Sequence, residues 1–374
     1  MEVEREVRSV RMSSPGVARW LQDKPAVLVA NPTAQSGKAA DWIRHARALL
    51  DQAGVTHRFV ATEPDGATVE RVREAIDGDG SRVIIYMGGD GTFAEVAKGI
   101  LGSEHAKQIA MGMLPTGTAN DQGKSFGLEA GAPALERNVD VIAAGHTIGC
   151  DVGVLTVERG AKEIAQDLFF DSFSIGIGAA SLATRNRDRE RVSKIPGLGA
   201  IYRDMFVYIG AVAQRFAESY VVDIKFDLDA VVDGTPHNYP GLLDVIVKNT
   251  KIFGGEWIFD AQAESDDGRF ELVPIAGRRD LTAKLIGSLR HSPIGMAELE
   301  QLGIENAPMV TGRRMELRVR TAGGTLPAAQ IDGEELPAGD RYLIEVATRA
   351  LRLIVPREHI DPAHVDHSGG TPTG

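Results

Sequence analysis

Residues 83–92 read VIIYMGGDGT, and this stretch decides how the N-terminal half of the chain is interpreted. The apolar run at 83–87 predicts a buried strand, and the glycines after it let the backbone approach a phosphate closely. A helix is expected to follow, and its positive N-terminus would favour an anion. Asp90 could orient Mg²⁺, and Thr92 could donate a hydrogen bond. An ordinary glycine-rich turn, in which both side chains cap the helix, stays open as an alternative.

Strands alternate with helices on both sides of this stretch. The pattern predicts strands at 26–30, 57–62, 83–87 and 109–114, and helices at 38–53, 68–76 and 93–100. Because the strands are continuously apolar, they indicate a parallel sheet covered on both faces. We therefore expect a doubly wound α/β domain over residues 25–148, which binds its ligand at the carboxyl ends of the strands.

The pattern changes after about residue 150, where apolar segments follow one another with few helices between them. Strands are expected at 169–177, 221–226, 242–248, 257–261, 269–274, 314–320 and 342–346, with helical interruptions at 201–216 and 281–288. Residues 149–349 are thus predicted to form an antiparallel β-sandwich or barrel. Residues 1–24 read as a polar leader, and residues 360–374 as a disordered tail.

Composition narrows the classes of function. The 374 residues carry a formal net charge of −11, so a nucleic-acid partner is not expected. The single cysteine, Cys150, excludes an intrachain disulfide and is interpreted as a small buried residue rather than a catalytic thiol. We see neither a signal peptide nor an apolar run of about 20 residues. A cytoplasmic protein is expected, with peripheral contact to a membrane left open.

A second glycine-rich junction follows the strand at 109–114. It reads PTGTAND, which places Gly117 and Thr118 at the end of a strand and Asn120 and Asp121 at the start of a helix. Neighbouring strand ends of this kind could together cradle a di- or triphosphate. Asn120 and Asp121 could equally be plain helix caps.

Two acidic turns lie in the second half. In QIDGEE, Asp332 or Glu334 could accept the proton of a hydroxyl group during phosphoryl transfer, although Asp-Gly between two strands is also an ordinary hairpin turn. In ESDDGR, the acids and carbonyls at 264–269 could hold a hard cation, or they could form a solvated turn.

In this order, the motifs resemble the catalytic domain of the bacterial diacylglycerol kinases and sphingosine kinase-like lipid kinases, over residues 24–357. The resemblance rests on NP at 31–32, GGDGT at 88–92, LPTGTAND at 114–121, DDG at 266–268 and DGE at 332–334. It implies an N-terminal nucleotide domain, a C-terminal β-sandwich, an active site in the cleft, and a last strand at 350–357 that returns to the first domain. Ala94 and Gln122 depart from the family pattern, which usually has Asn and an aromatic residue at these positions.

The resemblance also implies roles for individual residues. Glu334 would accept the proton, supported by Asp332, and Asp90 would hold the metal or orient the phosphates. A structural Mg²⁺ would be bound by the Asp267 carboxylate and the carbonyl oxygens of Glu264 and Arg269. The implied ATP contacts are Asn31, Thr62, Gly88, Gly89, Asp90, Gly91, Thr92, Glu95, Gly117, Thr118, Asn120 and Asp121.

The first functional hypothesis is therefore an ATP- and Mg²⁺-dependent lipid kinase acting on a diacylglycerol-like lipid. The alternatives are phosphorylation of a soluble nucleotide by an NAD kinase-type enzyme, and a catalytically weak protein that only binds nucleotide or lipid. The acceptor is a lipid or another alcohol, and a homodimer is one expectation from the family. The basic stretch at 185–194 and the apolar stretch at 201–216 could meet lipid, although a solvated loop and a core helix are the simpler interpretations.

Overall fold

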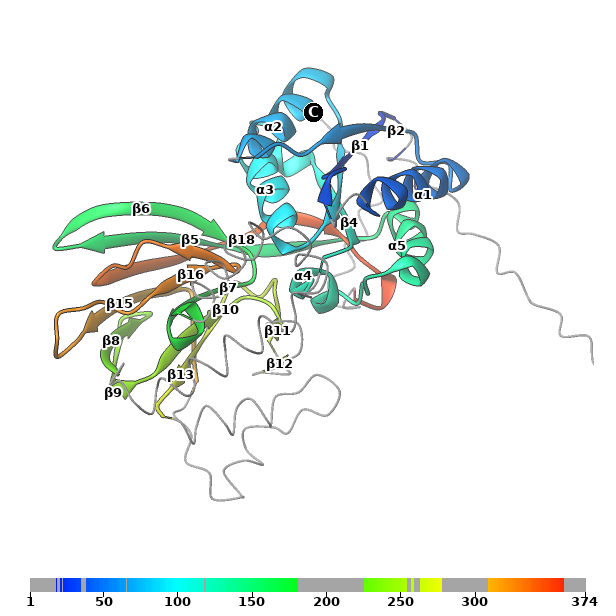
Figure 1. Ribbon diagram of the computed structural model, residues 1–374. Helices are drawn as coiled ribbons and strands as arrows, with labels where there is room; N and C mark the ends of the chain where they lie inside the picture. The colour runs from blue at the N-terminus through cyan, green and yellow to red at the C-terminus, as the bar shows by residue number, and fades with distance from the viewer. Residues whose placement is uncertain are drawn as a thin grey trace, which may run out of the picture.

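The computed structural model describes residues 18, 21, 23–34, 38–64, 66–117, 119–180, 225–253, 257–258, 263–277 and 309–359. These residues form an α/β lobe and a β-rich lobe (Figure 1). The predicted fold class is confirmed: an N-terminal α/β domain with a parallel sheet precedes a C-terminal antiparallel domain.

The α/β lobe is built on four parallel strands in the order β2-β1-β3-β4. They are β1 (Ala26–Ala30), β2 (His57–Ala61), β3 (Val83–Gly88) and β4 (Ala110–Pro115). Helices α2 (Ala67–Asp79) and α3 (Asp90–Leu101) pack on one face, and α1 (Lys38–Gln52) and α5 (Ala132–Ala144) on the other. Val29 contributes to the first apolar core and Leu28 to the second, which is why the strand is apolar throughout.

The β-rich lobe packs two sheets face to face. One contains β5 (Thr147–Arg159), β6 (Lys162–Phe169), β8 (Phe226–Val232), β9 (Thr235–Leu242), β15 (Arg314–Arg320) and β18 (Arg341–Ile354). The other contains β7 (Ser172–Gly176), β10 (Asp244–Lys248), β13 (Phe270–Ile275), β14 (Val310–Gly312), β16 (Ala329–Ile331) and β17 (Glu334–Leu336). Residues from both sheets, such as Leu317 and Val247, share one buried core, so the lobe is a sandwich.

The described chain also contains several small elements. They are the short pair β11 (Ile252–Phe253) and β12 (Trp257–Ile258), the five-residue helix α4 (Asp121–Ser125), and 3-10 turns at Ala106–Gln108 and Arg357–His359.

Strand β18 connects the two lobes. Its C-terminal end runs parallel to β4, with Arg352 opposite Ala110, while its first half pairs with β15 and almost its whole length pairs with β5. The register shifts between Ala347 and Leu351, where Arg349 has a positive φ of 50°. A single ten-stranded sheet therefore passes through both lobes (Figure 1).

The structure differs from the sequence expectations in several elements. Helix α3 begins at Asp90, three residues earlier than expected, so Asp90 and Thr92 lie in its first turn. Strands β5 and β6 and helix α5 were not expected; β6 reads KEIAQDLF and is largely exposed, so it lacks an apolar run. The strand expected at 221–226 lies mostly outside the described residues, and β8 begins at Phe226. The helices expected at 201–216 and 281–288 also lie outside the described residues.

Candidate active site between the lobes

Two glycine turns meet backbone to backbone at the carboxyl edge of the parallel sheet. The carbonyl oxygen of Gly88 accepts hydrogen bonds from the N–H groups of Thr116 (2.7 Å) and Gly117 (3.2 Å). A Cβ atom on Gly117 would lie 2.4 Å from the Cα of Gly89, closer than any real contact allows. The second turn therefore requires glycine, because a side chain there would push the two turns apart.

Asp90 ties these turns together. Its carboxylate accepts hydrogen bonds from the N–H groups of Asn120 (2.9 Å) and Gln122 (3.4 Å), at the start of α4. Asn120 has a left-handed backbone, and its side chain bonds the N–H (2.8 Å) and the carbonyl (2.7 Å) of Gly117. Burial, followed by the negative charge of Asp171, raises the pKa of Asp90 to about 6.

The other residues expected at the nucleotide lie along the same edge of the sheet. Thr62 follows β2, and its N–H bonds the carbonyl of Ala30 at 3.0 Å, beside Asn31 at the end of β1. Because β1 to β4 are parallel, their carboxyl ends lie at one edge, which these residues share with the glycine turns. Glu95 is half-buried in α3, and Asp121 is buried in the first turn of α4. Thr118 lies outside the described residues.

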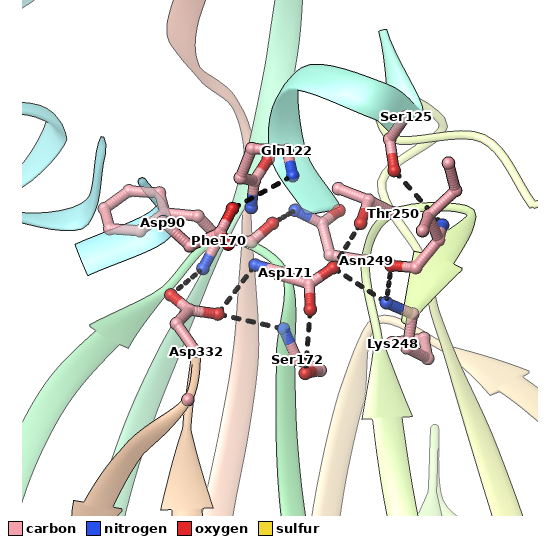
Figure 2. A network of polar contacts seen from close by, with 12 residues as sticks. Asp90, Gln122, Ser125, Phe170, Asp171, Ser172, Lys248, Asn249, Thr250 and Asp332 are labelled. Atoms are coloured by element: carbon pink, nitrogen blue, oxygen red, sulfur yellow. Dashed lines mark hydrogen bonds and ion pairs between the residues drawn. The ribbon is translucent and has the colours of Figure 1, made fainter. Parts of the chain in front are cut away.

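Asp332 occupies the two-residue turn between β16 and β17. Asp332 and Gly333 both have positive φ angles (47° and 82°), so the turn is the hairpin that Asp-Gly favours. The Asp332 carboxylate accepts three backbone hydrogen bonds, from Phe170 (2.8 Å), Asp171 (2.8 Å) and Ser172 (2.9 Å) (Figure 2). The hairpin interpretation and a role at the site are therefore compatible: the carboxylate fixes the hairpin against the turn between β6 and β7.

Burial also acts on Asp332. It raises the pKa of this carboxyl group to about 7, and the charge of Asp171 adds to the effect, while the three N–H donors oppose it.

Glu334, two residues further, is exposed and faces the glycine turn of the other lobe. A Cβ atom built on Gly91 would lie 3.8 Å from Oε1 of Glu334. Gly91 is in the first turn of α3, so the carboxylate lies beside the helix N-terminus that the first glycine turn leads into. The structure thus brings together residues that are more than half the chain apart.

A buried polar group behind Asp332 was not expected from the sequence. Asp171 accepts hydrogen bonds from Lys248 (2.7 Å), Ser172 (3.0 Å) and Thr250 (Figure 2). Asn249 donates its side-chain amide to the carbonyls of Phe170 and Asp151, each at 2.7 Å. The available signal was the run of polar residues at 248–250, which begins at the last residue of β10, after the apolar stretch 245–247.

The turn at 264–269 offers oxygen atoms of the kind that bind Mg²⁺. Asp267 is exposed, and its Oδ1 accepts the N–H of Arg269 at 2.8 Å. Burial raises the pKa of nearby Asp151, and the charges of Asp267 and Asp266 raise it further, so a cation here would relieve repulsion. Among the described residues, no three acidic, His or Cys side chains converge on one point. One carboxylate with backbone carbonyls and water nevertheless fits Mg²⁺, which keeps several waters in its shell.

Three further residues can now be placed. Gln122 is buried, and both polar atoms of its side chain lack a hydrogen-bond partner among the described residues. Ala94 packs against the apolar core of the α/β lobe. Cys150 is fully buried, and burial raises the pKa of its thiol, as expected of a structural cysteine.

Membrane contact is addressed by one finding: within the described ranges, no helix has the length and apolar character needed to cross a bilayer. The basic stretch at 185–194 lies outside those ranges.

Comparisons with known proteins agree with this architecture. The model of the diacylglycerol kinase catalytic domain matches residues 25–155. A diacylglycerol kinase of Staphylococcus haemolyticus (strain JCSC1435) is 32% identical over 252 residues, which cover 67% of each chain. A protein of Pseudomonas aeruginosa described as a probable lipid kinase, YegS-like, is 26% identical over 335 residues, 89% of this chain and 95% of the relative.

Other matches are shorter or structural. The diacylglycerol kinase of Staphylococcus carnosus (strain TM300) is 34% identical over 131 residues, which span 35% of this chain and only 40% of that relative. A crystal structure of a diacylglycerol kinase from Bacillus anthracis str. Sterne superimposes with a TM-score of 0.62 at 16% identity. It covers 90% of this chain and 98% of that one, which establishes a shared fold.

Proposed function

Because the chain belongs to the family of bacterial diacylglycerol kinases and related lipid kinases, we propose that it transfers the γ-phosphoryl group of ATP to a hydroxyl group of a diacylglycerol-like lipid. The observation that supports this most directly is the position of Glu334, whose carboxylate faces Gly91 at the N-terminus of α3. A phosphate-binding turn and a proton acceptor on opposite sides of a junction are the two parts that phosphoryl transfer to an alcohol needs.

We assign the nucleotide to the α/β lobe. Its phosphates would lie against the glycine turns at 88–92 and 116–121, where backbone N–H groups and the α3 N-terminus favour negative charge. Asn31, Thr62, Glu95 and Thr118 would border it. Asp90 would hold the two turns in register through its bonds to Asn120 and Gln122, and so orient the phosphates.

We assign the acceptor to the β-rich lobe, with its hydroxyl at Glu334. This carboxylate would take the proton as the γ-phosphoryl group moves, and Asp332 would keep the hairpin in place. Most of the rate would come from positioning and from neutralisation of charge. Mg²⁺ bound with ATP would neutralise phosphate charge; a separate Mg²⁺ would be structural, held by Asp267 and the carbonyls of Glu264 and Arg269.

The family membership also suggests where the protein acts and how it assembles. A cytoplasmic enzyme that meets its lipid at the membrane surface fits this proposal, and a homodimer is compatible with it.

The decisive experiment is transfer of labelled γ-phosphate from ATP to a panel of diacylglycerol, a sphingoid base, glycerol and NAD. Label should appear in diacylglycerol. Label only in NAD would favour the NAD kinase-type alternative, and ATP binding without transfer to any acceptor would favour a binding protein.

A variant pair tests the proton acceptor. Glu334→Gln should lower kcat by about 10²–10⁴-fold, because an amide cannot take the proton, while the fold persists. Glu335→Gln is the matched control, because the next side chain along a strand points to the opposite face. It should keep kcat near the wild-type value. Wild-type-like turnover in Glu334→Gln would contradict the assignment.

A further inference from the structure

The Phe170–Ser172 turn is held from both sides. On its front, three consecutive N–H groups bind the Asp332 carboxylate, and Ser172 returns a bond by accepting the N–H of Asp332 at 2.9 Å. On its back, the Asp171 carboxylate meets the ammonium group of Lys248 at 2.7 Å (Figure 2). Anything that moves Asp171 therefore moves the donors that fix the Glu334 hairpin.

Lys248 continues this chain of bonds toward the other lobe. Its ammonium also donates to the carbonyl of Ile252 at 2.7 Å, and the N–H of Ile252 donates to Oγ of Ser125 at 3.1 Å. Ser125 is the last residue of α4, whose first turn supplies the Gln122 N–H that binds Asp90. The bonds thus run without interruption from Asp90, through α4, Lys248 and Asp171, to Asp332.

The connection depends on a buried ion pair between Lys248 and Asp171. Lys248 and Asp171 are both buried, so each needs the other to offset its loss of hydration. Lys248 lies opposite Glu271 of β13 in the same sheet, and Asp90 and Asp332 are the other carboxylates whose charge interacts with Asp171. An uncharged side chain in place of Lys248 would deprive Asp171, and the acids near it, of their neighbouring positive charge.

From this geometry we infer that Lys248 and Asp171 are positioning residues, which align the Glu334 hairpin of the acceptor lobe with the Asp90 turn of the nucleotide lobe. The expected effect on kcat rests on the proposed function. The expected effect on the stability of the two turns does not, because it can be measured without any substrate.

The first test is amide hydrogen exchange on the full chain. In Lys248→Met, protection should fall in peptides that cover 168–173 and in peptides that cover 119–123, since both ends of the connection lose their link. In Asp171→Asn/Lys248→Met, protection should recover at 168–173, because residue 171 no longer carries an unpaired buried charge, but not at 119–123, because the bond to the Ile252 carbonyl stays lost. Loss confined to residues 244–253, or no recovery in the double variant, would overturn the inference.

The second test is kinetic. Lys248→Met should lower kcat for phosphoryl transfer by about 10²-fold, the effect of a small misplacement of reacting groups, with little change in KM for ATP. The double variant should regain at least about tenfold of that loss. A matched control is Arg341→Met, which removes a cation paired with Glu158 and Glu316 within the sandwich and should leave kcat unchanged.

The two proposals fail differently. If the wild-type protein transfers phosphate to no acceptor, the proposed function is wrong, yet hydrogen exchange still decides whether Lys248 couples the lobes. If the wild-type protein is active and Lys248→Met keeps its kcat, the positioning role is wrong while the proposed function stands.

Discussion

At the scale of single residues, Asp244 is an acid in an environment that disfavours its charge. It lies buried at the start of β10, where Oδ2 accepts the N–H of Gly178 at 2.6 Å. Within the part of the chain that the structure describes, Oδ1 has no hydrogen-bond partner. Burial raises the pKa of this carboxyl group to about 8. The folded protein should therefore carry Asp244 protonated at neutral pH.

This gives a prediction with a definite sign. Between about pH 4 and pH 8 the unfolded chain has released the Asp244 proton and the native state retains it, so the free energy of unfolding falls as pH rises. Asp244→Asn keeps an acceptor for Gly178 and removes the titration. Its stability relative to wild type should be greater at pH 8 than at pH 5, by on the order of 1 kcal/mol or more.

Urea unfolding at both pH values measures the effect. Asp227→Asn is the matched control, since exposed Asp227 also accepts a backbone N–H, from Gly241 at 2.9 Å. An equal stability difference at pH 5 and pH 8 for Asp244→Asn would show that Asp244 is ionised in the native state.

Single site residues could be predicted from the sequence only where they lie in a short, recognisable motif. Gly88 to Thr92 and Asp332 to Glu334 could be found because each acts through neighbours in the chain. Asp171 and Lys248 could not, because an acid and a lysine 77 positions apart carry no local sign that they are paired. Assigning Glu334 depended on family resemblance, since spacing alone favoured a simple hairpin.

At the scale of elements, the contact between the two glycine turns sets the shape of the proposed phosphate site. Gly117→Ala would place a Cβ 2.4 Å from the Cα of Gly89, and neither backbone can move freely because β3 and β4 are paired up to Gly88 and Pro115. Overpacking of this kind costs about 1–3 kcal/mol. The affinity for ATP should fall about tenfold or more, because about 1.4 kcal/mol corresponds to a factor of ten.

Isothermal titration calorimetry with ATP tests this, with circular dichroism to verify folding. Gly78→Ala in α2 is the control: its Cβ would meet nothing within 4 Å, so ATP affinity should be unchanged and the helix slightly more stable. Unchanged affinity in Gly117→Ala would mean that the nucleotide does not use this contact.

Helices and strands could be predicted from the sequence where burial of one face or of both faces leaves a clear pattern of apolar residues. The core strands β1, β3 and β4 are apolar throughout and were found within one residue. Strand β6 was missed because, among the described residues, it pairs only with β5 at an edge of the large sheet, and it exposes polar side chains on much of its length. Its strand conformation depends on a partner, not on its own sequence.

At the scale of the whole molecule, the lobes share a core as well as a sheet. The apolar cluster beneath α2 and α3 includes Val152 of β5, Phe170 of the β6–β7 turn and Leu351 of β18. Phe93 of α3 meets Phe170 edge to face, with ring centroids 5.6 Å apart. The ion pair of Lys98 with Asp167 also joins the lobes at 2.6 Å, but it is partly exposed and adds little.

We therefore predict one cooperative unfolding transition for both lobes. Calorimetric and van't Hoff enthalpies should agree, and Phe170→Ala should shift the single transition to lower temperature, at a cost of about 3–5 kcal/mol. Exposed Val231, replaced by Ala, should leave the transition temperature nearly unchanged. Two separate transitions would contradict a shared core. The family resemblance implied that the strand at 350–357 returns to the first domain, but the residue pattern alone could not reveal the shared core, because it depends on how distant strands pair.

The position of β18 has a consequence for how the protein is made. During translation β1 to β4 leave the ribosome early, but the strand that covers the free edge of β4 is synthesised long afterwards, once nearly all of the β-rich lobe has emerged. Until then the nascent chain presents an unpaired, apolar strand edge, which is a template for association with other chains. We therefore expect chaperones to bind the nascent α/β lobe until β18 has left the ribosome and paired with β4.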